Sequence, residues 1–311
     1  MCKLTEEQIE YAKNVYSSGS TYYDTCRELE KKYGVVVNPE SLRYYITKKE
    51  KPKLTLKEKL DKDGIEKVLF ISDIHVPFNR NDIIDIVTKH KDEISMIVFG
   101  GDLIDCHCIS SFGALDPMPL IDEMANTHNL LKKIQDITPG IDKYMILGNH
   151  EVRFKKYLEK NTSELNKLHS YNILEEIVKG FEKHDRLNGV TYKYEKLDYQ
   201  IADNWFMKVN DTIVCHPISF SRVAAKTAQM ALDYFVERNQ WEFSNILVAH
   251  THKISSAIKY GKYAYEIGCL ALPQSYAESG KLTYEKLQNG YFLAVYKNGK
   301  FDPNESRQYI L

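Results

Sequence analysis

Apolar positions recur with two different spacings in two parts of the chain. Between residues 4 and 47 they follow a helical period, as in Leu4, Ile9, Ala12 and Tyr16. Farther along, short runs that are apolar at every position alternate with amphipathic stretches. Such runs are typical of strands buried on both faces of a sheet. The pattern therefore predicts a small helical module followed by a larger α/β domain.

The helical module has signals for three helices. The second is expected over Tyr22 to Tyr33, and Gly34 supplies a turn after it. The third is expected to begin at Asn38, which suits the N-cap position, with Pro39 at the first helical position. This arrangement resembles a helix-turn-helix module. A lysine-rich segment follows, and the expected boundaries are 1–50 for the module, 51–64 for a linker and 65–311 for the main domain.

Five apolar runs in the larger domain predict strands. They are Val68–Ile71, Met96–Phe99, Tyr144–Leu147, Ile213–Val214 and Ile246–Val248. Helix-compatible segments, Asp82 to His90 and Ile121 to Ile137, separate the first three runs, which implies right-handed βαβ crossovers. The tail alternates over 262–267 and 291–296 and carries a hairpin-type turn at Asn298-Gly299, so antiparallel strands are expected there.

A polar cluster follows each of the five runs. The clusters are Asp73-Ile74-His75, Gly101-Asp102, Gly148-Asn149-His150-Glu151, Cys215-His216 and Ala249-His250-Thr251-His252. They stand at the carboxyl ends of the predicted strands, where an open α/β sheet places its ligands. Carboxylates, imidazoles and an amide oxygen form a mixed donor set suited to divalent manganese, iron, zinc or similar ions.

The spacing within the clusters suits two metal ions. In Asp73-x-His75 and His250-x-His252 the paired side chains are two residues apart, so in an extended chain they point the same way. A carboxylate such as Asp102 has two oxygens and can bridge two cations, which together clamp the attacking and leaving oxygens of an in-line displacement. The pattern therefore predicts phosphoester chemistry.

In this order the clusters resemble the D-x-H, G-D, G-N-H-D/E, H and G-H-x-H motifs of the calcineurin-like metallophosphoesterases. The resemblance covers about residues 66–253. It implies a four-layer α/β fold, in which two mixed β-sheets pack face to face with flanking helices, and a metal-dependent hydrolase of phosphate esters. The chain departs from the family pattern at Ala249, where the family usually has glycine, and at Pro217, which follows His216.

The resemblance also implies a role for each residue. Asp73, His75 and His252 would hold one metal, Asp102 would bridge, and Asn149, His216 and His250 would hold the second. His150 would bind the scissile phosphate and protonate the leaving oxygen. Asn149 and Arg153 are expected to contact the substrate phosphate, and Glu151 is expected to orient His150. The cofactors are expected to be two divalent ions, with manganese ahead of iron, zinc, nickel or magnesium.

Three other features leave alternatives open. Cys106-His107-Cys108 suggests a zinc site but lacks a second Cys/His pair at ligand spacing. Asp105 either supports the bridging site or is a surface or turn carboxylate. Residues 155–205 contain no motif, and they are either an insertion that caps the substrate or plain scaffold.

Composition limits the class of protein. Lysine and arginine number 42 against 43 acidic residues, a net charge of −1, so any contact with nucleic acid must use a local basic patch. Six cysteines without paired spacing do not indicate a disulfide scaffold. The first residues lack the apolar run of a signal peptide, and no window reaches the roughly 18 apolar residues of a membrane span. We therefore expect a cytoplasmic protein without a membrane partner.

The helical module has two interpretations. As a DNA-binding unit it would use its third helix, Pro39 to Lys49, for recognition. The residues available for phosphates or base edges are Ser41, Arg43, Tyr44, Lys48 and Lys49. Residues 1–62 carry an excess of roughly three positive charges, the sign that a phosphate backbone requires. Alternatively, the module is a helical bundle for packing or self-association, which would make the protein a homo-oligomer.

Three functional hypotheses follow. The first is a DNA-directed nuclease or phosphodiesterase, because a tethered hydrolase acts on the polymer that its module holds. The second is a phosphatase or phosphodiesterase acting on a phosphoprotein, nucleotide or cyclic nucleotide, with the N-terminal helices as a docking surface, since the fold hosts all of these. The third is a non-catalytic DNA-binding or scaffold protein that retains metals, which the presence of His150 argues against.

Overall fold

The chain forms two compact units. The computed structural model describes residues 4–17, 20–39, 41–42, 46, 64–110, 117–161, 171–273 and 287–311. The units are Met1–Leu56 and Lys57–Leu311. Within the described ranges, no helix combines the length and the apolar character that a membrane span requires.

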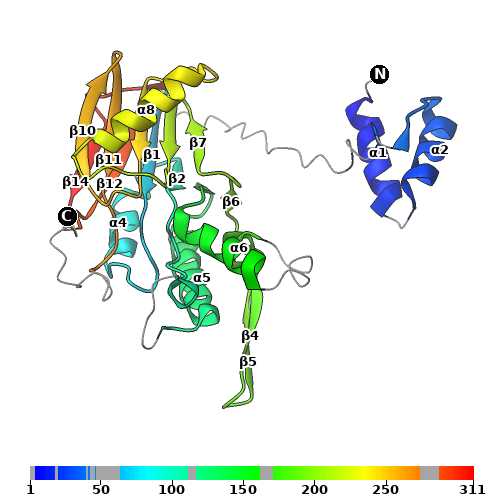
Figure 1. The fold of residues 1–311 in the computed structure, drawn as a ribbon, viewed down its shortest axis with the longest axis horizontal. Coiled ribbons are helices and arrows are strands. Elements are labelled where there is room, and N and C mark those ends of the chain that lie inside the picture. Colours follow the sequence, from blue (N-terminus) through cyan, green and yellow to red (C-terminus); the bar gives the residue numbers. More distant parts are fainter. Residues whose placement is uncertain are drawn as a thin grey trace. The chain divides into compact units, whose positions relative to one another are not determined.

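The smaller unit contains the predicted helical module. It holds α1 (Glu6–Ser17) and α2 (Tyr22–Tyr33), the latter with the predicted bounds (Figure 1). Gly34 ends α2 in the left-handed conformation at φ 66°, which glycine adopts without steric cost. Asn38 Oδ1 accepts the Ser41 N–H at 2.7 Å, so Asn38 caps the start of a third helical turn. Leu4, Ala12, Leu29 and Leu42 form the buried core of this unit.

The larger unit contains two mixed β-sheets. The first has the order β13-β12-β1-β2-β3-β6, with β14 also paired to β12, and the second has the order β10-β11-β9-β8-β7. The strands of the first are β1 (Ile65–Ile71), β2 (Met96–Phe99), β3 (Asp142–Met145), β6 (Gln200–Ile201), β12 (Gly290–Lys297), β13 (Lys300–Phe301) and β14 (Arg307–Ile310). Those of the second are β7 (Phe206–Val209), β8 (Thr212–Cys215), β9 (Asn245–Val248), β10 (Ile254–Lys259) and β11 (Lys262–Ile267). β1, β2 and β3 are parallel neighbours, as predicted.

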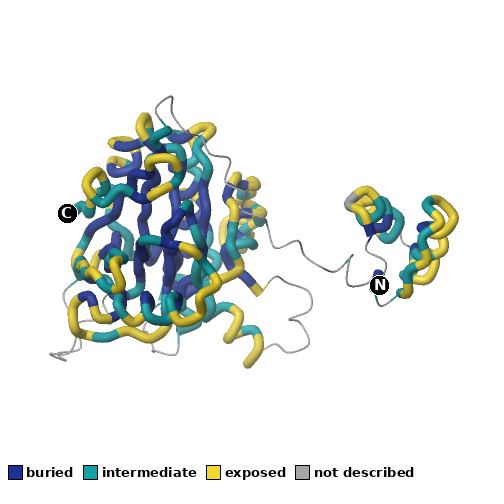
Figure 2. Tube along the Cα trace, turned by 90° about the horizontal axis from the view of Figure 1, so that it is seen from above, coloured by how far each residue is buried: buried dark blue, intermediate teal, exposed yellow. Residues whose placement is uncertain are grey.

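Helices cover the outer faces of the two sheets. The first sheet packs against α4 (Ile83–His90), α5 (Leu120–Ile137) and α7 (Ile173–Lys179), and the second packs against α8 (Lys226–Arg238). The inner faces meet where the Tyr296 hydroxyl donates to Thr212 Oγ1 at 2.6 Å and where the Tyr265 and Phe292 rings lie 4.8 Å apart. The central strands of both sheets are consequently buried (Figure 2), and the runs Val68–Ile71, Met96–Phe99 and Ile246–Val248 are covered on both sides. This explains why their sequences are apolar at every position, and it confirms the predicted four-layer fold.

Two elements of the fold differ from the sequence prediction. β11 is antiparallel to β10 but parallel to β9, so the expectation of a purely antiparallel tail is wrong there. A hairpin of β4 (Phe181–Asp185) and β5 (Val190–Tyr194) occupies part of the region without motifs. Its signal was the dipeptide Asn188-Gly189, which favours a tight turn between two strands.

Candidate metal centre

The polar clusters meet at one edge of the two sheets. Each lies where its strand ends: Asp73 after β1, Asp102 after β2, Asn149 at the start of α6 (Asn149–Asn161), His216 after β8 and His250 after β9. β1, β2 and β3 are parallel in one sheet, and β8 and β9 are parallel in the other. Parallel strands end at the same edge, so the fold collects side chains from positions up to 179 residues apart, from Asp73 to His252.

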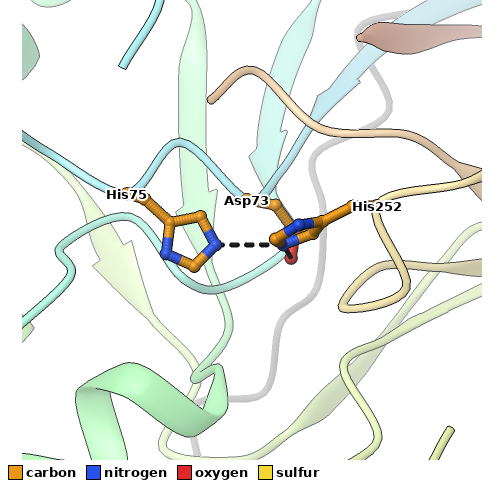
Figure 3. Close-up of side chains that lie close together, drawn as sticks. All are labelled: Asp73, His75 and His252. Atoms are coloured by element: carbon orange, nitrogen blue, oxygen red, sulfur yellow. Dashed lines mark hydrogen bonds and ion pairs between the residues drawn. The ribbon is translucent and has the colours of Figure 1, made fainter. Parts of the chain in front are cut away.

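Asp73, His75 and His252 form the first group of potential ligands (Figure 3). One ligand atom from each lies within 4.8 Å of the others. His252 Nε2 lies 3.2 Å from Asp73 Oδ1, and the Nε2 atoms of His75 and His252 lie 3.1 Å apart. Two imidazole nitrogens and a carboxylate directed at one point are a donor set that suits a divalent transition-metal ion.

Asp102, His216 and His250 form the second group. His216 Nδ1 lies 2.8 Å from the Gly100 carbonyl oxygen, which only accepts, so Nδ1 carries the hydrogen. A neutral His216 then directs the lone pair of Nε2 at Asn149 Oδ1, 3.1 Å away, and at Asp102 Oδ2, 3.2 Å away. Lone pairs that face one another at these distances require a cation or a proton between them.

The pKa values of the second group agree with this reading. Although burial opposes the charge, the Asp102 carboxylate raises the pKa of His216 to about 10. A proton thus takes the place that a metal cation would fill. Burial lowers the pKa of His250 to about 4, and its buried Nε2 has no hydrogen-bond partner among the described residues. A neutral imidazole with an orphaned buried nitrogen fits a metal ligand.

Asp102 belongs to the second group and also approaches the first. Its Oδ2 is 3.2 Å from His216 Nε2 and 3.8 Å from the Nε2 atoms of both His75 and His150. Its Oδ1 accepts the His150 backbone N–H at 2.8 Å, which fixes the orientation of the carboxylate. This is the position that a carboxylate needs in order to bridge two cations.

Asp105 holds two of the imidazoles from behind. Its Oδ1 lies 3.0 Å from His75 Nδ1 and 2.9 Å from His150 Nδ1. A carboxylate that accepts from Nδ1 leaves Nε2 with its lone pair, so Asp105 sets the tautomer of both rings. Asp105 is fully buried, which rules out the surface alternative. Sequence offered only its spacing of three residues from Asp102.

Arg153 covers the free nitrogen of His150. Arg153 Nη2 lies 2.9 Å from His150 Nε2, and Nη1 donates to the Asp105 carbonyl oxygen at 2.9 Å. Arg153 follows His150 by three residues on α6, so the two side chains are neighbours on the helix surface. A guanidinium next to an imidazole nitrogen is placed to meet a phosphate oxygen.

The expectation that Glu151 orients His150 is wrong. The Glu151 carboxylate instead accepts backbone N–H groups of Gly148 at 2.8 Å, Asp102 at 3.0 Å and Leu103 at 2.7 Å. Burial, followed by the nearby Asp102 charge, raises the pKa of Glu151. Glu151 therefore ties together the two loops that carry Asp102 and Asn149, and it supports the site through the backbone.

The side chains converge through backbone turns. Asp73, His75, Asp102, His250 and His252 all have positive φ, between 50° and 75°. The expectation that each i, i+2 pair lies in an extended chain is therefore wrong. A non-glycine residue in this region is uncommon and is stabilised only by surrounding structure, as at many functional sites. Ala249 is outside the positive-φ set, so alanine in place of the family's glycine causes no backbone strain.

A loop after His216 lines the side of the site. The Phe220 ring lies 5.2 Å from the His250 ring in an edge-on arrangement and is 56% exposed. Lys253 fixes this loop, because its Nζ donates to the Ser221 carbonyl at 3.1 Å and to the Arg222 carbonyl. No sequence signal indicated this role for Phe220 or Lys253.

Gly148 has no room for a side chain. A Cβ there would collide with Asp102 Oδ1 and the Asp102 backbone nitrogen. Gly148→Ala is therefore expected to lower the free energy of unfolding by about 1–3 kcal/mol, the usual cost of overpacking, and to weaken metal binding. Thermal unfolding with and without Mn²⁺ measures both effects. Gly189→Ala is the control, because a Cβ there meets nothing although φ is +65°. Equal losses in the two variants would contradict the prediction.

Two further sets of predicted residues are the proposed nucleic-acid contacts and the segment Cys106-His107-Cys108. Of the residues proposed for nucleic acid, Ser41 is described, and Arg43, Tyr44, Lys48 and Lys49 lie outside the described residues. Cys106, His107 and Cys108 belong to none of the potential metal-binding groups found among the described residues. The separate zinc site therefore has no structural support there.

Comparison with known proteins gives one family match and several distant structural likenesses. The model of the family described as "Calcineurin-like phosphoesterase" matches residues 66–254. Vacuolar Protein Sorting 29 from Cryptosporidium parvum is 11% identical over 80% of this chain and 99% of its own, with a TM-score of 0.38. An archaeal phosphodiesterase is 12% identical over 79% of this chain and 99% of its own, with a TM-score of 0.37. At these values the likenesses say nothing about substrate.

Among the curated proteins, none matches the chain. The family match alone spans more than half of its length, and it covers all five polar clusters. The chain belongs to the calcineurin-like phosphoesterases, which are metal-dependent hydrolases of phosphate esters.

Proposed function

We propose that this protein is a dinuclear-metal phosphodiesterase that acts on DNA. The observation that carries the catalytic part is the position of Asp102 Oδ2, within 3.8 Å of imidazole nitrogens from both ligand groups. A single carboxylate between two such groups suits a pair of cations at bridging distance. The donors are oxygens and imidazole nitrogens without cysteine, which favours Mn²⁺ over softer ions.

In this proposal the site would hold two ions. Asp73, His75 and His252 would hold the first, Asn149, His216 and His250 would hold the second, and Asp102 would contribute to both. When bound, the two cations supply the positive charge that stabilises a phosphoryl transition state and a nucleophilic water at neutral pH. Two observations support this assignment. The buried Nε2 of His250 has no hydrogen-bond partner among the described residues, and the lone pair of His216 Nε2 faces Asn149 Oδ1.

The chain's own residues then handle the substrate and the proton. His150 Nδ1 is held by Asp105, so Nε2 is the atom that can take up a second proton and, from the imidazolium form, donate it to the leaving oxygen. Arg153 Nη2 lies 2.9 Å from that same nitrogen. Proton donation therefore requires that Arg153 turn from His150 to the substrate phosphate, to which a guanidinium binds through two N–H groups.

The N-terminal unit supports DNA over a small substrate. It contains α1, α2 and a capped third helical turn, the order of elements in a helix-turn-helix. Residues 1–62, which include the lysine-rich segment after this unit, have an excess of roughly three positive charges, which favours contact with a phosphate backbone. A DNA-binding unit linked to the hydrolase raises the local concentration of DNA at the metal centre.

Metal removal tests the proposal. Mn²⁺ is expected to support hydrolysis of bis-p-nitrophenyl phosphate and of labelled single- and double-stranded DNA, and a chelator is expected to abolish both. Both activities require the positive charge of the metal ions that the ligand groups would hold. The measurement is parallel rates on the two substrates and on p-nitrophenyl phosphate, with the same protein after chelation and Mn²⁺ return as control.

Each outcome decides one part of the proposal. Hydrolysis of the small diester without cleavage of any DNA form would refute the nuclease and favour a nucleotide or phosphoprotein substrate. Faster hydrolysis of the monoester than of the diester would make the protein a phosphatase. No turnover of any ester by protein that binds metal would leave a non-catalytic role.

A further inference from the structure

Helix α6 carries a basic stripe that begins at the metal centre. The helix starts at Asn149, and Arg153, Lys156 and Lys160 follow at spacings of four, three and four residues. At about 100° per residue these four positions fall within roughly 60° of one another, so they share one face of the helix. The three residues that follow the candidate ligand Asn149 along this face are therefore all cationic.

The stripe faces solvent. Lys156 and Lys160 are exposed, whereas Phe154, on the other side of the helix, packs against the hydrophobic core. Among the described residues neither lysine forms an ion pair, in contrast to Lys132 of α5, whose Nζ lies 2.5 Å from Asp136 Oδ1. Two unpaired ammonium groups on one exposed face are available to an anionic partner.

The other charged residues of α6 lie off the stripe. Helical geometry puts Lys155 and Glu159 together, roughly 40° apart and to one side of Lys156 and Lys160. Opposite charges four residues apart offset each other on a helix surface. The positive charge of α6 is therefore concentrated on the face that leads to Asn149.

We propose that this stripe, Arg153, Lys156 and Lys160, guides the backbone of a nucleic-acid strand into the metal centre. The inference rests on the proposed nuclease function and adds a substrate-binding surface to it. From Asn149 to Lys160 the helix rises roughly 16 Å at about 1.5 Å per residue. One strand carries a phosphate about every 3.4 Å along a duplex axis, so several phosphates fit along the stripe. The stripe is continuous with the site, since Arg153 already contacts His150.

A charge reversal separates this surface from the chemistry. Lys156→Glu with Lys160→Glu is expected to raise KM for a labelled single-stranded oligonucleotide by about tenfold or more at low salt, while kcat on bis-p-nitrophenyl phosphate stays unchanged. The slope of log KM against log salt is expected to become shallower by about 1.4, or about 0.7 per lost phosphate contact on a single strand. Lys155→Glu is the matched control, a lysine on the same helix that is also exposed but outside the stripe.

Binding of the same oligonucleotide, measured by fluorescence anisotropy in the presence of chelator, keeps the two proposals distinct. Weaker binding in the double variant than in the control supports the stripe even if wild-type protein cleaves no DNA, and that result would refute only the nuclease. Equal KM and equal binding in the double variant and the control would overturn the stripe. A parallel loss of activity on the small diester would also overturn it, because the lysines would then act on the site itself.

Discussion

Asp102→Ala is expected to abolish phosphoester hydrolysis and to leave the protein without its pair of metal ions. Asp102 Oδ2 lies within 3.8 Å of an imidazole nitrogen from each ligand group, so its removal takes away the one carboxylate that both groups share. The value of kcat/KM is expected to fall by about 10³-fold or more, since electrostatic stabilisation of the transition state is removed. Elemental analysis of the purified variant measures the metal content directly.

Two further variants make this result specific. Asp102→Asn keeps an oxygen that can accept the His150 backbone N–H, which Asp102 Oδ1 accepts at 2.8 Å, but removes the charge. It should therefore fold like wild type and still lose metal. Asp92→Ala, at an exposed carboxylate, should change neither metal content nor activity. Because Mn²⁺ should bind wild type and Asp92→Ala, it should raise the Tm of both by mass action. It should leave the Tm of Asp102→Asn unchanged. Retention of both ions by Asp102→Ala would contradict the bridging role.

His150→Ala is expected to keep both metal ions and lose turnover. His150 lies beside the ligand groups, with Nδ1 on Asp105 and Nε2 under Arg153. Removal of a general acid costs typically about 10²–10⁴-fold in rate. The loss should be largest for esters with poor leaving groups, because p-nitrophenolate departs without a proton. Rates across a series of leaving groups measure this, together with elemental analysis.

The control for His150→Ala is another histidine. His184 lies exposed in the β4–β5 hairpin, where its Nδ1 is 2.9 Å from Thr191 Oγ1. His184→Ala should keep both metal content and activity. If His150→Ala lost its ions, His150 would be a ligand and its role as proton donor would be refuted. If it kept full activity on every ester, another group would be the acid.

The pattern of apolar residues was sufficient for much of the fold. A run such as Val68–Ile71, apolar at every position, predicts a strand covered on both faces, and β1 is such a strand between two layers. Helical spacing predicted α2 and nearly all of α5. These elements are determined locally, because periodicity and turn residues such as Gly34 depend on the neighbouring chain alone.

The sequence also determined which residue types gather at the site. Asp73, Asp102 and His216 each follow an apolar run, and strand ends of parallel sheets meet at one edge. The sequence predicted that these residues lie near one another, but not which of their atoms are in contact. Strand order, as in β11 between β9 and β10, depends on long-range pairing that no local pattern specifies.

Only the tertiary structure decided how these residues act. Glu151 reads as a neighbour of His150, yet it binds the backbone of Asp102 and Gly148, because a buried carboxylate needs several donors and the adjoining loops supply them. Asp105 is one acid among many in the sequence, and becomes a support for two imidazoles through burial. The left-handed backbone of Asp73 and His250 likewise depends on surrounding packing that overcomes local steric preference. Sequence thus determined the elements and the chemical groups, whereas long-range packing determined the geometry that joins them.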